Sequence, residues 1–142
     1  MNLSPTDDVR PSASSLVLDA SALLALVFNE AGADVVEEAM SGDVAMSAVN
    51  LAEVVSRLVD YGLDAAEATD ILGPLSFRFR VVDFGSEAAW RSGLLRSATK
   101  RLGLSLGDRA CVALAVELDI PVLTADQAWS SLALGISVRT IR

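Results

Sequence analysis

The chain has 142 residues, which is enough for one domain with a sizeable buried core. It contains no histidine, one cysteine and one lysine. These counts exclude a Ser-His-Asp triad, a Cys-His nucleophile pair, a histidine zinc site and an internal disulfide. We expect Cys111, in an apolar helical run, to be a buried and inert thiol. Any chemistry must therefore depend on carboxylates, hydroxyls, arginines or a bound metal.

Composition and charge limit the location and the partners. Hydrophobic residues make up 52% of the chain, so some apolar surface can be buried against a partner or a second copy. No apolar run approaches the roughly 18 residues of a membrane helix. The first fifteen residues of the chain lack the apolar core of a signal peptide. We expect a soluble, cytoplasmic protein with no membrane partner. The net charge of −8 argues against binding to nucleic acid. The charge is uneven, however, because residues 78–142 hold nine basic and six acidic side chains, so a local phosphate-binding face is not excluded.

The hydrophobic pattern predicts the elements in chain order. Residues 1–14 are polar and contain two prolines, which indicates a disordered tail ahead of one domain at residues 15–142. Short apolar runs predict strands at 16–18, 44–46, 77–84, 122–124 and 136–141. Helical spacing predicts helices at 20–28, 33–40, 48–61, 64–72, 86–101, 108–118 and 127–134. Strands alternating with helices predict an α/β domain, with a mainly parallel sheet covered on both faces.

Four carboxylates stand at the start of an element or near the strand-tip side of this fold: Asp19, Glu53, Asp108 and Asp126. A parallel sheet brings the carboxyl ends of its strands to one edge, where ligands bind. Carboxylates that converge there repel one another, and a divalent cation relieves the repulsion. Oxygen ligands without cysteine or histidine favour Mg²⁺, with Mn²⁺ as a substitute.

Each carboxylate also has a simpler structural explanation. Asp19 and Asp126 can cap the helices that follow them. Asp108 lies three residues after Ser105, in the spacing of a capping box. Glu53 can pair with Arg57 on a solvated helix face. The functional hypothesis therefore depends on the four acids together.

Four segments resemble the PIN-domain ribonucleases, in particular the VapC-type toxins of bacterial toxin–antitoxin pairs. The matching segments are residues 17–21 (VLDAS), 47–54 (SAVNLAEV), 104–108 (LSLGD) and 123–126 (LTAD). The resemblance covers about residues 15–141, and it implies a PIN-like α/β/α sandwich. It further implies a metal-dependent endoribonuclease that leaves 5′-phosphate and 3′-hydroxyl ends.

The resemblance also implies roles for residues. Asp19 and Asp108 would be the main metal ligands, directly or through water, while Glu53 and Asp126 would complete the site or orient the attacking water. Ser21 and Thr124 match hydroxyl positions beside the metal. A homodimer, a cognate antitoxin and a place in a type II toxin–antitoxin system are implied in the same way.

A cluster of basic residues is a candidate for binding the RNA substrate. Five basic side chains fall within nineteen residues and end beside Asp108: Arg91, Arg96, Lys100, Arg101 and Arg109. They are either a solvated helix face or a patch that positions phosphates. Trp90 and Trp129 can stack on bases, but core packing is the favoured interpretation for both.

Two alternatives to a nuclease differ in class. One is a catalytically silent PIN-like module that binds RNA or protein, although four mutually repelling acids give a pure binder no advantage. The other is a phosphoryl-transfer domain of the receiver type, which by resemblance needs a lysine near the site, and Lys100 is poorly placed for that role. Neither glycine motif of the common nucleotide-binding folds is present.

Overall fold

A computed structural model describes residues 15–142, and the predicted disordered tail at residues 1–14 lies outside the described residues. Five strands form one sheet in the order β3-β2-β1-β4-β5, and every neighbouring pair is parallel. The strands are β1 (Leu16–Leu18), β2 (Val44–Ser47), β3 (Arg80–Val82), β4 (Val122–Thr124) and β5 (Val138–Thr140). The predicted α/β class with a mainly parallel sheet is therefore confirmed.

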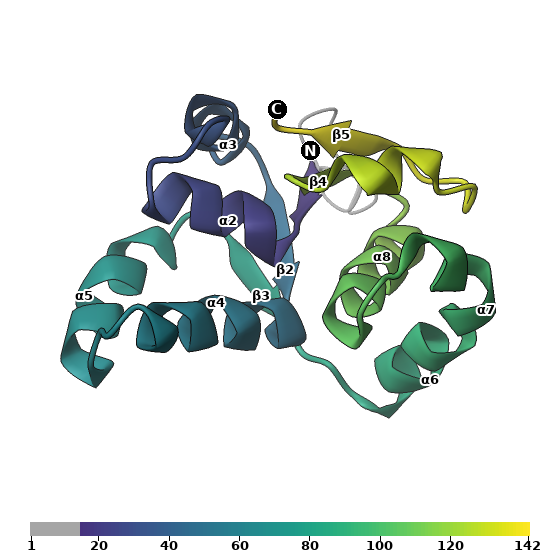
Figure 1. Ribbon diagram of the computed structural model, residues 1–142, viewed down its shortest axis with the longest axis horizontal. Helices are drawn as coiled ribbons and strands as arrows, with labels where there is room; N and C mark the ends of the chain where they lie inside the picture. Colours follow the sequence, from purple (N-terminus) through teal and green to yellow (C-terminus); the bar gives the residue numbers. More distant parts are fainter. Residues whose placement is uncertain (1–14) are drawn as a thin grey trace, which may run out of the picture.

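The helices form two layers, one on each face of the sheet (Figure 1). The first layer consists of α2 (Ala20–Val27), α3 (Ala33–Ala39), α4 (Ala48–Asp60) and α5 (Ala65–Leu75). The second consists of α6 (Ser86–Leu94), α7 (Arg96–Thr99), the 3-10 turn η1 (Lys100–Leu102) and α8 (Leu106–Leu118). A second 3-10 turn, η2 (Gln127–Ser131), precedes β5. Within residues 15–142, no helix combines the length and apolar character needed to cross a bilayer.

The alternation of side chains along β1 accounts for the two layers. Leu16 and Leu18 belong to the hydrophobic core beneath α2 and α3, whereas Val17 belongs to the core beneath α8. Successive strand residues point to opposite faces, so an apolar strand with no polar position is buried on both sides. All three residues are at most 4% exposed. This central strand therefore fixes the residue that follows it, Asp19, at the middle of the sheet edge.

Several element boundaries differ from the predictions, and the strand expected at 136–141 spans only Val138–Thr140. The strand expected at 77–84 spans only Arg80–Val82, because it is an edge strand that pairs with β2 alone. Phe77, in the expected strand, is 91% exposed. Helix α5 continues through Pro74 instead of ending before it, since a proline in the last turn removes only one hydrogen bond. The helix expected at 127–134 is the shorter 3-10 turn η2.

The single helix expected at residues 86–101 is divided into α6, α7 and η1. The Ser92 and Thr99 hydroxyls donate to the carbonyls of Ala88 and Leu95, each at 2.8 Å. Side-chain bonds to the carbonyl four residues earlier commonly bend helices, which accounts for the interruption.

Helical spacing in the sequence predicts an apolar stripe on α4 at Leu51, Val55, Leu58 and Val59, and the buried face differs from it. Its fully buried residues are Asn50, Val54 and Leu58, while Val55 and Val59 are exposed. A polar residue on a buried helix face is favourable only when its hydrogen bonds are satisfied inside the protein. The acceptors described below satisfy this condition for the N–H groups of the Asn50 amide.

Candidate active site

An open pocket of about 570 Å³ is lined by residues from three helix regions, those of α2, α4 and α8. Three of the four predicted carboxylates line it, one from each helix region: Asp19 before α2, Glu53 on α4 and Asp108 on α8. The remaining lining residues are Ala20, Ser21, Leu24, Val49, Ala52, Ser56 and Arg57. The fold thus brings together acids that are up to 89 positions apart in the chain (108 − 19).

Asp19 is the most buried of these acids, with 3% of its surface exposed. Its Oδ1 accepts a hydrogen bond from the Ala20 N–H at 2.8 Å, so the predicted cap of α2 is present. Its Oδ2 accepts from the Ser21 hydroxyl at 2.6 Å and from the Thr124 hydroxyl at 2.8 Å. Both carboxylate oxygens are therefore held in place before any ligand binds.

The two hydroxyls join β1 to β4 at the edge of the sheet. Ser21 Oγ accepts from the Ala125 N–H and Thr124 Oγ1 accepts from the Asp126 N–H, both at 3.0 Å. The two oxygens lie 3.3 Å apart. Each hydroxyl thus donates to Asp19 and accepts from a backbone N–H just after β4. Both hydroxyls contact Asp19, which the resemblance implies is a main metal ligand.

Burial dominates the electrostatics of Asp19. It raises the pKa of this carboxyl from 3.8 to about 6, with a further upward effect from Asp108, against the lowering effects of the bonds from Ser21, Thr124 and Ala20. A carboxylate in water-poor surroundings is favoured in its neutral form, and a nearby positive charge reverses that preference. A cation bound beside Asp19 would therefore favour the ionised form of this carboxyl.

The buried thiol of Cys111 lies on α8, one turn beyond the pocket. Burial raises its pKa well above the usual value, and the negative charges of Asp19, Asp108 and Glu53 act in the same direction. The predicted burial of Cys111 is confirmed. Its raised pKa opposes thiolate formation, as expected of an inert thiol.

Glu53 is fixed by a neighbour on its own helix. The side-chain amide of Asn50 donates to Glu53 Oε1 at 2.8 Å and to the Gly107 carbonyl of α8 at 3.0 Å. Within residues 15–142, Glu53 and Arg57 form no ion pair, so the predicted pairing is wrong. The Arg57 guanidinium is instead an exposed cation at the rim of the pocket.

Asp108 occupies the third position of α8 and closes a capping box. Its N–H donates to Ser105 Oγ at 3.1 Å, and its Oδ2 accepts from the Ser105 N–H at 2.9 Å. The capping prediction is therefore confirmed, and it does not exclude the functional role, because the box uses only one carboxylate oxygen. The helix begins at Leu106, two residues earlier than expected.

Asp126 stands apart from the other three acids. It is exposed, caps η2 by accepting from the Ala128 N–H at 3.0 Å, and does not belong to the pocket lining. Its backbone N–H nevertheless bonds to Thr124, the residue that contacts Asp19. Its carboxylate is thus placed beside the pocket rather than in its wall.

The donor set fits a hard divalent cation held partly through water. Within the described chain, no three acidic or sulfur ligands lie close enough together to hold one ion directly. Mg²⁺ commonly uses one or two carboxylates and keeps several waters. Three carboxylates around one open pocket, with no histidine or thiol exposed in it, match that mode.

The five predicted RNA-binding residues divide into two groups. Arg91 pairs with Glu87 at 2.6 Å and Glu117 at 2.9 Å, and Arg109 Nη1 donates to the Ser92 carbonyl at 3.0 Å. Arg91 thus pairs with one acid on its own helix, α6, and one on α8, and Arg109 connects α8 to α6. The exposed members of the group lie on α7 and η1: Arg96, Lys100 and Arg101.

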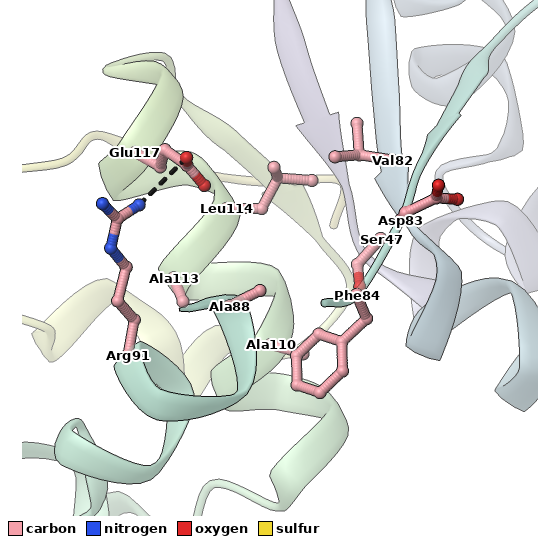
Figure 2. Close-up of a pocket in the computed structure, with 10 residues that line it drawn as sticks. All are labelled: Ser47, Val82, Asp83, Phe84, Ala88, Arg91, Ala110, Ala113, Leu114 and Glu117. Atoms are coloured by element: carbon pink, nitrogen blue, oxygen red, sulfur yellow. Dashed lines mark ion pairs between the residues drawn. The ribbon is translucent and has the colours of Figure 1, made fainter. Parts of the chain in front are cut away.

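A second pocket, between the ends of β2 and β3 and the helices α6 and α8, is much smaller (Figure 2). Its volume of about 20 Å³ has room for little more than one water. Figure 2 shows Asp83 and Glu117 on opposite sides of it, with Glu117 directed toward Arg91. This pocket therefore resembles a packing defect between helices rather than a second acidic site.

The two tryptophans differ in burial. Trp129 is fully buried in the core beneath α8, as predicted, whereas Trp90 on α6 is 72% exposed and the core prediction for it is wrong. The periodicity of α6 placed Trp90 in an apolar stripe with Leu94, and Leu94 is exposed as well. An apolar helix face has the same pattern whether a core or a partner covers it.

Three residues were not predicted to belong to the site or to contact its acids: Arg57, which lines the pocket, and Asn50 and Gly107, which lie against Glu53. Asn50 and Gly107 lie inside the segments that carry the PIN resemblance, three residues before Glu53 and one before Asp108. For Asn50, the available indication was its position one helical turn before Glu53. Nothing in the sequence indicates that Gly107 of α8 touches Glu53 of α4.

The family model of the PIN domain matches residues 16–134. No curated protein matches the sequence. Among solved structures, VapBC2 from Rickettsia felis bound to a promoter DNA fragment superposes with a TM-score of 0.71 at 14% identity, over 89% of this chain and 98% of that chain. A toxin–antitoxin complex from Klebsiella pneumoniae gives 0.69 at 21% over 89% and 98%, and FitAcB from Neisseria gonorrhoeae gives 0.67 at 23% over 89% and 97%. With most of its length matched by the family model and its fold shared with these structures, the chain belongs to the PIN-domain family.

Proposed function

We propose that this chain is a Mg²⁺-dependent endoribonuclease that acts in the cytoplasm as the toxin of a type II toxin–antitoxin system. The observation that carries the proposal is the pocket in which Asp19, Glu53 and Asp108 converge from three helix regions of a PIN-domain chain. PIN domains are typically nucleases that use divalent metal ions. The acids of this pocket are the residues that such chemistry requires.

In this proposal the acids have distinct tasks. Asp19 and Asp108 hold the ion, which Mn²⁺ can replace, while Glu53 orients the attacking water and Asp126 completes the site from its edge. When bound, the ion orients and activates a water and offsets charge on the scissile phosphate. Ser21 and Thr124 keep the Asp19 carboxylate in one orientation. The products carry 5′-phosphate and 3′-hydroxyl ends.

RNA would approach through the open side of the pocket. Arg57, at its rim, supplies a cation for the phosphate backbone beside the acids. The exposed Arg96, Lys100 and Arg101 supply more positive charge on the α7–η1 segment. Phosphate contacts of this kind position a nucleic acid without reading its sequence.

A protein partner is part of the proposal. The neighbours from Klebsiella pneumoniae and Rickettsia felis are a toxin–antitoxin complex and a VapBC complex, in which a toxin is bound to its antitoxin. This chain exposes apolar side chains on α4 and α6, including Val59, Trp90 and Leu94, which a partner or a second copy would cover. We therefore infer a homodimer that is kept inactive by a cognate antitoxin.

The deciding experiment is cleavage of mixed cellular RNA by purified, antitoxin-free protein in Mg²⁺, Mn²⁺ or EDTA. We expect discrete bands that require the metal and disappear with Asp108→Asn. Folded, metal-loaded wild-type protein that leaves all RNA intact would contradict the nuclease proposal.

Growth tests the toxin role separately. Expression of the wild-type chain alone should slow growth, and Asp19→Asn should restore it. Normal growth on confirmed expression of folded wild-type protein would contradict the toxin role while leaving nuclease activity to the cleavage assay.

A silent PIN-like module that binds RNA or protein is the second candidate. One observation favours it: no three acids of residues 15–142 are close enough to hold an ion together. Absence of metal binding by calorimetry, combined with absence of cleavage, would support this candidate. Metal-dependent cleavage would exclude it.

A further inference from the structure

Asn50 is a fully buried polar residue bonded to Glu53, one of the acids that line the pocket. It lies on the buried face of α4 with Val54 and Leu58, and its exposed fraction is 0%. Burying an amide without hydrogen bonds costs several kilocalories per mole, so such residues persist where the amide has specific partners. Here the partners are Glu53 Oε1 at 2.8 Å and the Gly107 carbonyl at 3.0 Å.

The orientation of this amide follows from its partners. Both are acceptors, so the two N–H groups of Nδ2 must face them. The other atom, Oδ1, is buried and has no hydrogen-bond partner among the described residues. A reversed amide would place Oδ1 against a carboxylate oxygen and a carbonyl. An apolar residue of similar size would leave both acceptors without their donor.

Gly107 lets the Glu53 carboxylate lie directly on the first turn of α8. A Cβ at position 107 would lie 2.5 Å from the Cδ, Oε1 and Oε2 atoms of Glu53. The backbone of Gly107 is helical and not in the left-handed region, so a Cβ here would be opposed only by the Glu53 carboxylate, which would have to move. The next residue is Asp108, which links the position of Glu53 to a second acid of the pocket.

We propose that Asn50 is a positioning residue of the nuclease site, which orients Glu53 and ties it to the helix turn that carries Asp108. This inference rests on the proposed function. Asn50 binds Oε1 of Glu53, and Oε2 has no hydrogen-bond partner among the described residues. Oε2 is therefore the oxygen available to the ion or its water. Asn50 itself contacts neither, because its amide is used by Glu53 and Gly107.

The first test measures Mn²⁺ affinity by calorimetry on the full chain without RNA. Removing an outer partner of a ligating group typically weakens metal binding about tenfold to a hundredfold. We expect Asn50→Ala to weaken binding at least about tenfold and to lower kcat, with KM for RNA within about twofold of wild type. Ser92→Ala is the matched control, since Ser92 is equally buried and its hydroxyl bonds only within α6.

A double variant separates positioning from general stability. In a Glu53→Gln background, Asn50→Ala should cause no further loss of Mn²⁺ affinity, because its effect passes through the Glu53 carboxylate. Equal losses in both backgrounds would overturn the proposal. So would an Asn50→Ala protein that binds Mn²⁺ and cleaves RNA like wild type.

Gly107→Ala keeps the test available if Asn50→Ala does not fold. It leaves Asn50 intact but forces the Glu53 carboxylate away from α8. We expect the same loss of Mn²⁺ affinity, and wild-type affinity would overturn the proposal. A wild-type protein whose Mn²⁺ affinity depends on Asn50 and Glu53, but which cleaves no RNA, would instead contradict the proposed function alone.

Discussion

The Thr124 hydroxyl donates a 2.8 Å hydrogen bond to Oδ2 of Asp19, a residue 105 positions earlier in the chain. The Thr124 hydroxyl oxygen also accepts a hydrogen bond from the Asp126 N–H at 3.0 Å. Thr124 is fully buried at the end of β4, and Asp19 follows β1, the neighbouring strand. One hydroxyl therefore links the two strand ends that carry Asp19 and Asp126.

We expect Thr124→Val to lower the free energy of unfolding by about 1–3 kcal/mol. Valine has nearly the same shape, so the loss reflects a buried carboxylate without one donor and an Asp126 N–H without its acceptor. Urea denaturation in EDTA measures the change. Thr140→Val, at an exposed position in β5, is the matched control. Equal effects of the two substitutions would contradict the role of the Thr124 hydroxyl.

The raised pKa of Asp19 predicts how stability depends on pH without metal. Asp19 ionises near pH 3.8 in an unfolded chain and near pH 6 in the folded protein. Between these values the native state binds more protons, so the free energy of unfolding falls as pH rises from 3.8 to about 6. A shift of this size corresponds to at most about 3 kcal/mol.

Asp19→Asn provides the control for this pH dependence, because its side chain does not titrate. Both proteins are denatured in EDTA at several pH values across this range. As the pH rises, the unfolding free energy of the wild type should fall relative to that of the variant. Parallel curves would show that the pKa of Asp19 is not raised.

The sequence predicts much of this fold because its strands are buried on both faces. Leu16, Val17 and Leu18 form an uninterrupted apolar run, and such a run followed at once by a helical pattern is typical of a parallel strand. The predicted parallel sheet with helices on both faces is confirmed. The edge strand at Arg80–Val82 was predicted too long, because alternating residues at an exposed edge give no clear end.

The site was less predictable than the fold. Three acids that the sequence singled out line one pocket, since the topology brings the ends of their elements together. The contact of Gly107 with Glu53 depends on how two helices pack, which no local pattern encodes. The exposure of Trp90 was missed for a related reason, because an apolar helix face does not reveal what covers it.

Mg²⁺ should stabilise the wild-type protein and not its Asp108 variant. A ligand that binds only the folded state at about one hundred times its Kd adds about 2.7 kcal/mol to the free energy of unfolding. We expect Asp108→Asn to remove most of this gain. Asp126→Asn should retain most of it, because Asp126 is exposed and lies outside the pocket lining. Thermal denaturation with Mg²⁺ and with EDTA gives the comparison.

Asp64→Asn is the control for this metal effect. Asp64 belongs to a capping box on α5, as Asp108 does on α8, but it does not line the pocket. Its substitution should leave the stabilisation by Mg²⁺ intact. Loss of the effect in both variants would assign it to helix capping and not to the acidic pocket.

The exposed basic residues on α7 and η1 should contribute to RNA binding without sequence preference. We expect Arg96→Ala to weaken binding of single-stranded RNA in EDTA, and each lost phosphate contact should reduce the salt slope by about 0.7. Arg139→Ala, on edge strand β5, is the control with a matched change in charge. Arg109→Ala should mainly lower stability, since Arg109 bonds to the Ser92 carbonyl and is half-buried. Unchanged RNA affinity of Arg96→Ala at low salt would remove this segment from the binding surface.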